Sequence, residues 1–146
     1  MVRKVKIGII QSKISDNTQS NIILAIKSIK KAASKKAKII CVPELFLSTY
    51  FCQTESHSNF KLAEKIPGRI TKIFSDLAKE LGVILILSLF EKKTSGFYHN
   101  TSIVINEIGK ILTKYRKMHI PDDPGYYEKF YFTPGDLGFK SVKTKF

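Results

Sequence analysis

Two charged side chains stand immediately after apolar segments of the sequence. Glu44 follows Pro43 and the short apolar run 38–42, and Lys117 follows the strand-like segment 110–115. A partly desolvated carboxylate is a stronger base than an exposed one, and a lysine held beside it can stabilise a developing oxyanion. The pair therefore predicts a site that joins a base to a cation. A surface glutamate and a basic turn would leave the same pattern.

Chemistry of this kind usually needs a nucleophile as a third partner, and the two thiols of the chain are weak candidates. Cys41 lies inside an apolar run and is expected to be buried and inert. Cys52 follows Phe51 in a loop with no adjacent histidine or basic residue to lower its pKa. His119 is expected to form structural hydrogen bonds, because no metal-ligand spacing appears in the sequence. The chain thus presents a base and a cation without an evident nucleophile.

A third group of polar residues lies in the loop that follows Lys117. Asp122, Asp123 and Glu128 are interspersed with the tyrosines and phenylalanines of segment 126–132. Acidic groups beside aromatic rings suit an organic cation, through charge and through attraction to the ring face. An ordinary exposed loop with aromatic packing explains the same composition, so both interpretations remain open.

The hydrophobic pattern predicts an α/β fold with a mixed sheet. A strand over 5–11, a helix over 21–37 and a strand over 38–42 form the unit that is typical of parallel pairing. Asp16 or Asn17 is suited to cap the first helix, and Gly82 to end the second. The expected later elements are a loop over 45–60, a helix over 70–81, strands over 83–90, 98–105 and 110–115, a long functional loop over 118–138, and a strand that begins at 139–142.

Length and composition favour one soluble domain. The 146 residues are 43% hydrophobic and 25% charged, and no apolar run approaches the ~20 residues of a membrane helix. The first residues lack the apolar stretch of a secretory signal, and two cysteines do not make a disulfide framework. We therefore expect a cytoplasmic protein without a membrane partner.

The net charge of +13 raises the possibility of nucleic-acid binding. However, 22 of the 25 basic residues are lysines, and the densest run, 27–38, lies on the expected solvent face of a helix. Arginine, which reads base edges in specific binders, occurs only three times. We expect solvated lysine-rich surfaces and no nucleic-acid partner, with a basic binding module as the alternative.

Two motifs resemble those of the nitrilase, or carbon-nitrogen hydrolase, superfamily. They are Val-Pro-Glu-Leu-Phe over 42–46 and Tyr-Arg-Lys-Met-His-Ile-Pro over 115–121, and the segments 6–11 and 98–101 also look familiar. The resemblance implies that Glu44 is the base and that Lys117 stabilises the tetrahedral intermediate. It also implies an α-β-β-α sandwich fold and no metal or organic cofactor.

The loop over 118–136 resembles that of the N-carbamoylputrescine amidases within this superfamily. The resemblance implies a carbamoylated amine as small-molecule substrate, with Glu128 orienting the substrate and Lys117. It also implies a homo-oligomer when complete. An amidase that acts on carbamoyl amino acids is the alternative.

The nucleophilic cysteine of this superfamily follows the next strand, beyond Phe146. The resemblance therefore implies that residues 1–146 are the N-terminal portion of the domain: a shortened chain, a split gene product or a degenerate paralogue. We expect this portion to be inactive alone. We also expect it to expose an apolar sheet face, such as that of 83–87, and to associate through it.

Overall fold

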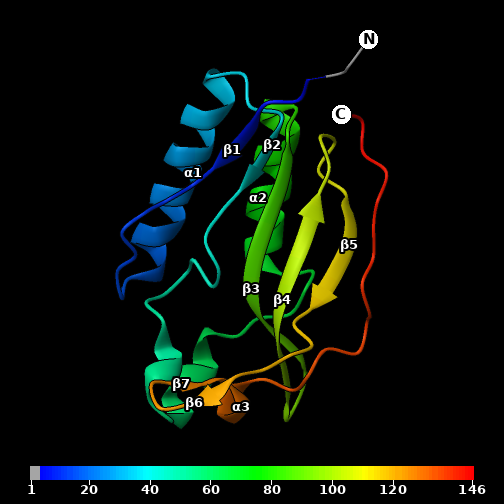
Figure 1. Ribbon diagram of the computed structural model, residues 1–146. Coiled ribbons are helices and arrows are strands. Elements are labelled where there is room, and N and C mark those ends of the chain that lie inside the picture. The colour runs from blue at the N-terminus through cyan, green and yellow to red at the C-terminus, as the bar shows by residue number, and fades with distance from the viewer. Residues whose placement is uncertain (1–3) are drawn as a thin grey trace.

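The computed structural model describes residues 4–146, and the first three residues, which bear on the signal-peptide interpretation, lie outside this range. A five-stranded sheet lies against two long helices, with a smaller region of short elements at one end (Figure 1). None of the helices in the described part is long and apolar enough to span a membrane.

The strands are arranged in the order β1-β2-β3-β4-β5. The first three are parallel, and the last two are each antiparallel to their predecessor, so the predicted mixed sheet is confirmed. The elements are β1 (Ile7–Ile9), α1 (Thr18–Ser34), β2 (Ile39–Cys41), α2 (Arg69–Leu81), β3 (Ile84–Thr94), β4 (Phe97–Ile105) and β5 (Ile111–Arg116).

The helix ends follow from local chemistry. The side chain of Asn17 accepts a hydrogen bond from the backbone N–H of Ser20 at 2.8 Å, so α1 begins at Thr18. It ends three residues before the predicted boundary, because Lys36 has a φ of 70° and turns the chain toward β2. Gly82 ends α2 with a φ of 60°, as predicted.

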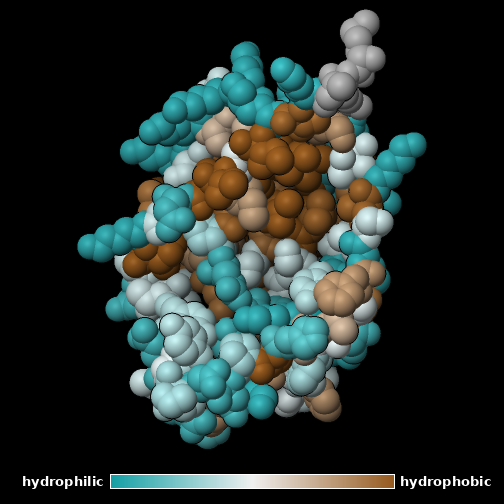
Figure 2. All heavy atoms as spheres, in the orientation of Figure 1, coloured by the Kyte–Doolittle hydropathy of each residue, from teal (hydrophilic) through white to brown (hydrophobic). Residues whose placement is uncertain are grey.

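The sheet has two different faces. Ile40, Leu85 and Ile105 lie in one row across the strands, are fully buried and belong to the core under the helices. The next row carries Ile9 and Cys41 on the opposite face, where Ile9 is 81% exposed. Figure 2, in the same orientation as Figure 1, shows apolar side chains gathered over this helix-free face.

The prediction that segment 83–87 exposes an apolar face was wrong about the strand. Val83, Ile84, Leu85 and Leu87 are at most 2% exposed, because β3 is the central strand and is flanked by β2 and β4. Ile86 alone in this segment is partly exposed. The most exposed apolar side chains of the sheet are Ile7 and Ile9 on the edge strand β1. Association through this face stays a prediction.

The end of the sheet that carries the long loops has a core of its own. Phe51, Phe90, Tyr131 and Phe132 are buried together, and the ring centroids of Phe51 and Phe90 are 5.1 Å apart. The short elements around this core are the 3₁₀ helices η1 (Phe51–Gln53) and η2 (His57–Leu62), the hairpin of β6 (Asp122–Asp123) and β7 (Tyr126–Tyr127), and α3 (Glu128–Tyr131).

Two predictions about the second half of the chain were therefore wrong. The segment 118–138 is not structureless, because residues 122–131 form the hairpin and α3 and their aromatic side chains pack into the second core. That this segment is functional stays a prediction. The segment 139–142 forms no strand in the described structure. Phe139 instead stacks on Tyr115 of β5, with ring centroids 5.7 Å apart, and remains 75% exposed.

Candidate active site

Glu44 is positioned by the turn that follows β2. Pro43 ends the strand, and Leu45 takes a φ of 48°, a left-handed conformation that is uncommon for a leucine. The backbone N–H of Leu45 donates to Ser88 Oγ at 3.1 Å, which holds this turn against β3. The Glu44 side chain is 55% exposed, so the predicted desolvation of this carboxylate was wrong in this structure.

Asn100 orients Glu44 from the neighbouring strand β4. Its Nδ2 donates to Glu44 Oε1 at 2.7 Å, while its own side chain is buried. Its backbone carbonyl also accepts from the N–H of Lys117 at 2.8 Å. One residue of β4 thus positions the carboxylate through its side chain and the lysine through its backbone.

Lys117 lies just past the end of β5 and joins two carboxylates. Its Nζ donates to Glu128 Oε2 at 2.8 Å and lies 3.4 Å from Glu44 Oε1. Burial lowers the pKa of Lys117, but the hydrogen bonds and charges of Glu128 and Glu44 outweigh it and raise the pKa above its usual value. The amine therefore stays an ammonium at neutral pH.

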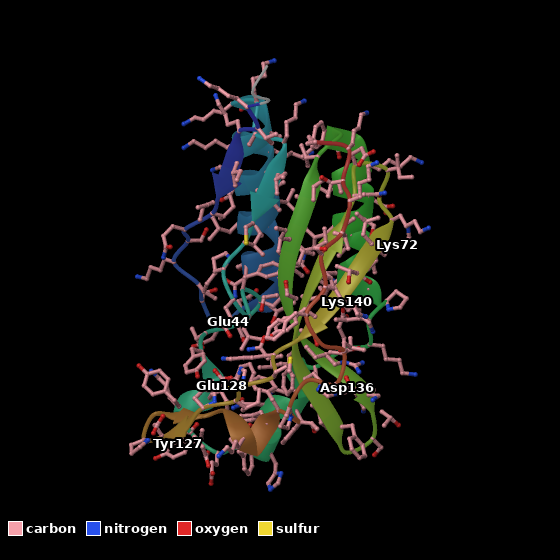
Figure 3. All side chains as sticks on the ribbon, turned by 45° about the vertical axis from the view of Figure 1, so that its right-hand side comes forward. Glu44, Lys72, Tyr127, Glu128, Asp136 and Lys140 are labelled. Atoms are coloured by element: carbon pink, nitrogen blue, oxygen red, sulfur yellow. The ribbon has the colours of Figure 1, made fainter. Side chains whose placement is uncertain are left out.

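Glu128 is the buried member of the group. It is the first residue of α3 and is 2% exposed, and its Oε1 also accepts from the hydroxyl of Tyr50 at 2.9 Å. Burial and the hydrogen bond to Glu128 raise the pKa of Tyr50, so its hydroxyl keeps its proton and remains a donor. Figure 3 shows Glu44 and Glu128 close together, although they lie far apart in the sequence.

The structure thus brings together the three predicted residues Glu44, Lys117 and Glu128. It adds Tyr50 and Asn100, which sequence reasoning did not identify as site residues. Asn100 lies in the segment 98–101 that the family resemblance had marked, so a signal existed for it. No spacing in the sequence pointed to Tyr50, because its partner is 78 residues away.

The acidic residues of the hairpin stay apart from this group. Asp122 and Asp123 are exposed, and the carboxylate of Asp122 lies 3.8 Å from Lys129 Nζ. No hydrogen bond or ion pair in the described structure joins either aspartate to Glu44 or Lys117. The predicted set of acidic residues is therefore divided, with Glu128 inside the site and the aspartates outside it.

Neither thiol has the properties of a nucleophile. Cys52 is fully buried, and burial together with the nearby charge of Glu128 raises its pKa to about 12. Burial also raises the pKa of Cys41, although this residue was expected to be buried and is only half-buried, on the helix-free face. Raised pKa values disfavour the thiolate at both positions, and that neither thiol is reactive stays a prediction. Among residues 4–146, no cluster of histidine, cysteine and acidic side chains could hold a metal ion.

Comparison with known proteins decides the family. Residues 6–146 match the carbon-nitrogen hydrolase family. The chain belongs to this family. It is 44% identical to N-carbamoylputrescine amidase from Oryza sativa subsp. japonica, over 98% of this chain and 48% of the relative. It is 38% identical to a citrullinase from Francisella tularensis, over 97% of this chain and 50% of the relative.

Solved structures give the same fold. A carbon-nitrogen hydrolase from Helicobacter pylori G27 superposes with a TM-score of 0.91 at 41% identity, and the match covers 97% of this chain and 48% of that one. An amidase from Nesterenkonia sp. superposes with a TM-score of 0.71 at 22% identity, over 91% of this chain and 49% of that one. The predicted nitrilase-type α/β fold is confirmed, and the chain spans about half the length of the relatives it matches.

Proposed function

We propose that the protein containing this chain hydrolyses N-carbamoylputrescine to putrescine, carbon dioxide and ammonia. The observation that carries the proposal is the placement of Lys117, with its Nζ 2.8 Å from Glu128 Oε2 and 3.4 Å from Glu44 Oε1. Identity of 41–44% to plant N-carbamoylputrescine amidases along nearly the whole chain supports this substrate. A cytoplasmic role in polyamine synthesis and homo-oligomeric assembly form part of the proposal.

In the proposed mechanism, Glu44 removes the proton from a cysteine thiol of the full-length protein. The sulfur attacks the ureido carbon, and the resulting oxyanion is stabilised by the ammonium of Lys117. The proton held by Glu44 passes to the terminal amino group, which leaves as ammonia. Glu44 then activates water to cleave the thioester, and the released carbamic acid breaks down to putrescine and carbon dioxide.

Glu128 and Tyr50 support this chemistry without a proton transfer of their own. Glu128 is buried and receives hydrogen bonds from Lys117 and Tyr50, so it holds the ammonium in one place. Both hydrogen bonds described for Glu44 reach Oε1, which leaves Oε2 for the reacting groups. In this proposal Glu44 transfers the protons, and Glu128 only holds the Lys117 ammonium in position.

A ureido amino acid is the second candidate substrate class, because the match to the citrullinase extends over 97% of this chain. N-Carbamoylputrescine and citrulline share the ureido group and differ at the distal end, which is an amine in one and an amino acid in the other. Ammonia release by the full-length protein from each compound distinguishes them. A kcat/KM that favours citrulline would contradict the proposed substrate.

The 146-residue chain alone is expected to show no turnover, because both of its thiols have raised pKa values. Ammonia release from N-carbamoylputrescine by the purified chain is the measurement, with the full-length protein as positive control. Turnover that disappears in Cys52→Ala would mean that Cys52 serves as the nucleophile, contrary to this proposal.

A further inference from the structure

A second set of charged residues lies directly behind Lys117. Successive residues of a strand point to opposite faces of the sheet, so Arg116 points away from Glu44 and Glu128. The Arg116 side chain is only 6% exposed, and its Nε and Nη2 donate to the two oxygens of Glu91 at 2.8 Å each. This is the bidentate arrangement that fixes a guanidinium in orientation as well as in position.

Both carboxylate oxygens of Glu91 accept hydrogen bonds. It is 2% exposed and also accepts hydrogen bonds from Lys114 Nζ at 2.9 Å and from Thr101 Oγ1 at 2.7 Å. Burial disfavours its charge, but the hydrogen bonds from Arg116, Lys114 and Thr101 outweigh burial and lower its pKa to about 2. The pair is therefore ionised at neutral pH and links β3 to β5.

The same guanidinium also holds the segment that returns from α3. Arg116 Nη1 donates to Asp136 Oδ1 at 2.7 Å, and Lys93 Nζ donates to Asp136 Oδ2 at 2.7 Å. Next to Asp136, the N–H of Gly135 donates to the carbonyl of Lys117 at 2.8 Å. A Cβ on Gly135 would lie 1.9 Å from the carbonyl oxygen of Arg116, so only glycine allows this approach.

These contacts act on both members of the Lys117–Glu128 pair. The peptide unit of Lys117 is held on one side by the carbonyl of Asn100 and on the other by the N–H of Gly135. The segment that ends at Asp136 follows Glu128 by a few residues and is tied to β4 by the N–H of Thr133, which donates to the carbonyl of Tyr98 at 2.8 Å. Releasing Asp136 would loosen the backbone of Lys117 and the support of Glu128 together.

We infer that Glu91, Arg116 and Asp136 are positioning residues that set the place of the Lys117 ammonium from the opposite face of the sheet. The inference rests on the amide hydrolysis proposed above. None of the three touches the reacting atoms. Their effect passes through the backbone of residue 117 and through the segment that carries Glu128.

The test uses the full-length protein with Asp136→Asn and Arg116→Lys. Asp136→Asn is the main variant because its side chain is 44% exposed and tolerates the change. Asp76→Asn is the matched control, since Asp76 pairs with Lys72 on an exposed helix surface. The readouts are kcat and KM for N-carbamoylputrescine, the melting temperature, and the pH dependence of amine acylation at Lys117, followed by peptide mass spectrometry.

We expect Asp136→Asn to lower kcat roughly tenfold and Arg116→Lys roughly 10–100-fold, with KM changed less than about threefold, because misplacement of an ammonium weakens mainly the transition state. Lys117 should become acylated at a lower pH in both variants, since its link to Glu128 is loosened. Asp136→Glu, which keeps the charge, should recover part of kcat.

Unchanged kcat and unchanged acylation of Lys117 in both variants would overturn the inference. So would a loss of kcat that matches the loss of folded protein. If the unmutated protein hydrolyses no ureido compound, the proposed function fails, while the acylation profile still decides whether these residues position Lys117.

Discussion

Two groups of carboxylates and cations lie on opposite faces of the same strand end, and they differ in exposure. Behind the sheet, Glu91 and Arg116 have side chains that are 2% and 6% exposed. In the candidate site, Glu44 and Lys117 have side chains that are 55% and 29% exposed. Each group pairs a carboxylate with a cation, and the two cations, Arg116 and Lys117, are neighbours in the sequence but stand in different environments.

The two groups also differ in how many of their polar atoms have hydrogen-bond partners. Both oxygens of Glu91 and three nitrogens of Arg116 have partners, which suits a structural link. Glu44 has hydrogen bonds at one oxygen only in the described structure, which leaves it able to exchange a proton. The candidate pair Glu44–Lys117 thus differs from the link behind the sheet in having an unpaired carboxylate oxygen that is open to solvent.

The largest expected effect is on activity, from Glu44→Gln. The amide keeps the size of the side chain but cannot accept a proton, so kcat of the full-length protein should fall roughly 10²–10⁴-fold. Steady-state ammonia release measures it. Glu80→Gln, at an exposed pair with Lys30, is the control and should keep full activity. A Glu44→Gln protein with near-normal kcat would remove the base from the mechanism.

A large effect on stability is expected from Glu91→Gln in the link behind the sheet. The substitution leaves the buried Arg116 without its charged partner, so the free energy of unfolding should fall by about 3 kcal/mol. Chemical denaturation measures the change, again with Glu80→Gln as the comparison. If Glu91→Gln lost no more stability than Glu80→Gln, the buried link would contribute no more to stability than an exposed ion pair.

The acid stability of the protein should follow from the same carboxylate. The folded-state pKa of Glu91, about 2, lies below its ordinary value of 4.5, so the stability it contributes is complete above pH 4.5 and is lost as the pH falls toward 2. Denaturation curves between these pH values should show this loss. Glu91→Gln should flatten that part of the profile, and an equally steep profile in the variant would assign the loss to other groups.

The smallest effect is expected at an exposed pair outside both groups. Lys72 Nζ and Asp76 Oδ2 are 2.9 Å apart on α2, but their side chains are 77% and 68% exposed. Asp76→Asn should change the free energy of unfolding by at most about 0.5 kcal/mol, because solvent screens the interaction. A change above 1 kcal/mol would show that exposure does not separate strong pairs from weak ones here.

Much of the fold was predictable because the relevant signals are local. The alternation of apolar residues, the cap at Asn17 and the glycine at 82 act over a few residues, and they placed the helices and the strands of the sheet. The segments 118–138 and 139–142 were predicted wrongly because their conformation depends on distant partners. Phe132 packs against Phe51 and Phe90, and Phe139 against Tyr115.

The sequence by itself determined the family and the fold class, and it predicted Glu44, Lys117 and Glu128 as site residues, since their motifs are contiguous and specific. Only the tertiary structure decided that Lys117 lies between the two glutamates, that Tyr50 and Asn100 complete the group, and that Arg116 is tied to Glu91 on the opposite face. The physical reason is that these contacts join residues far apart in the chain. Their distances and burial exist only after the strands have paired and the loop has packed.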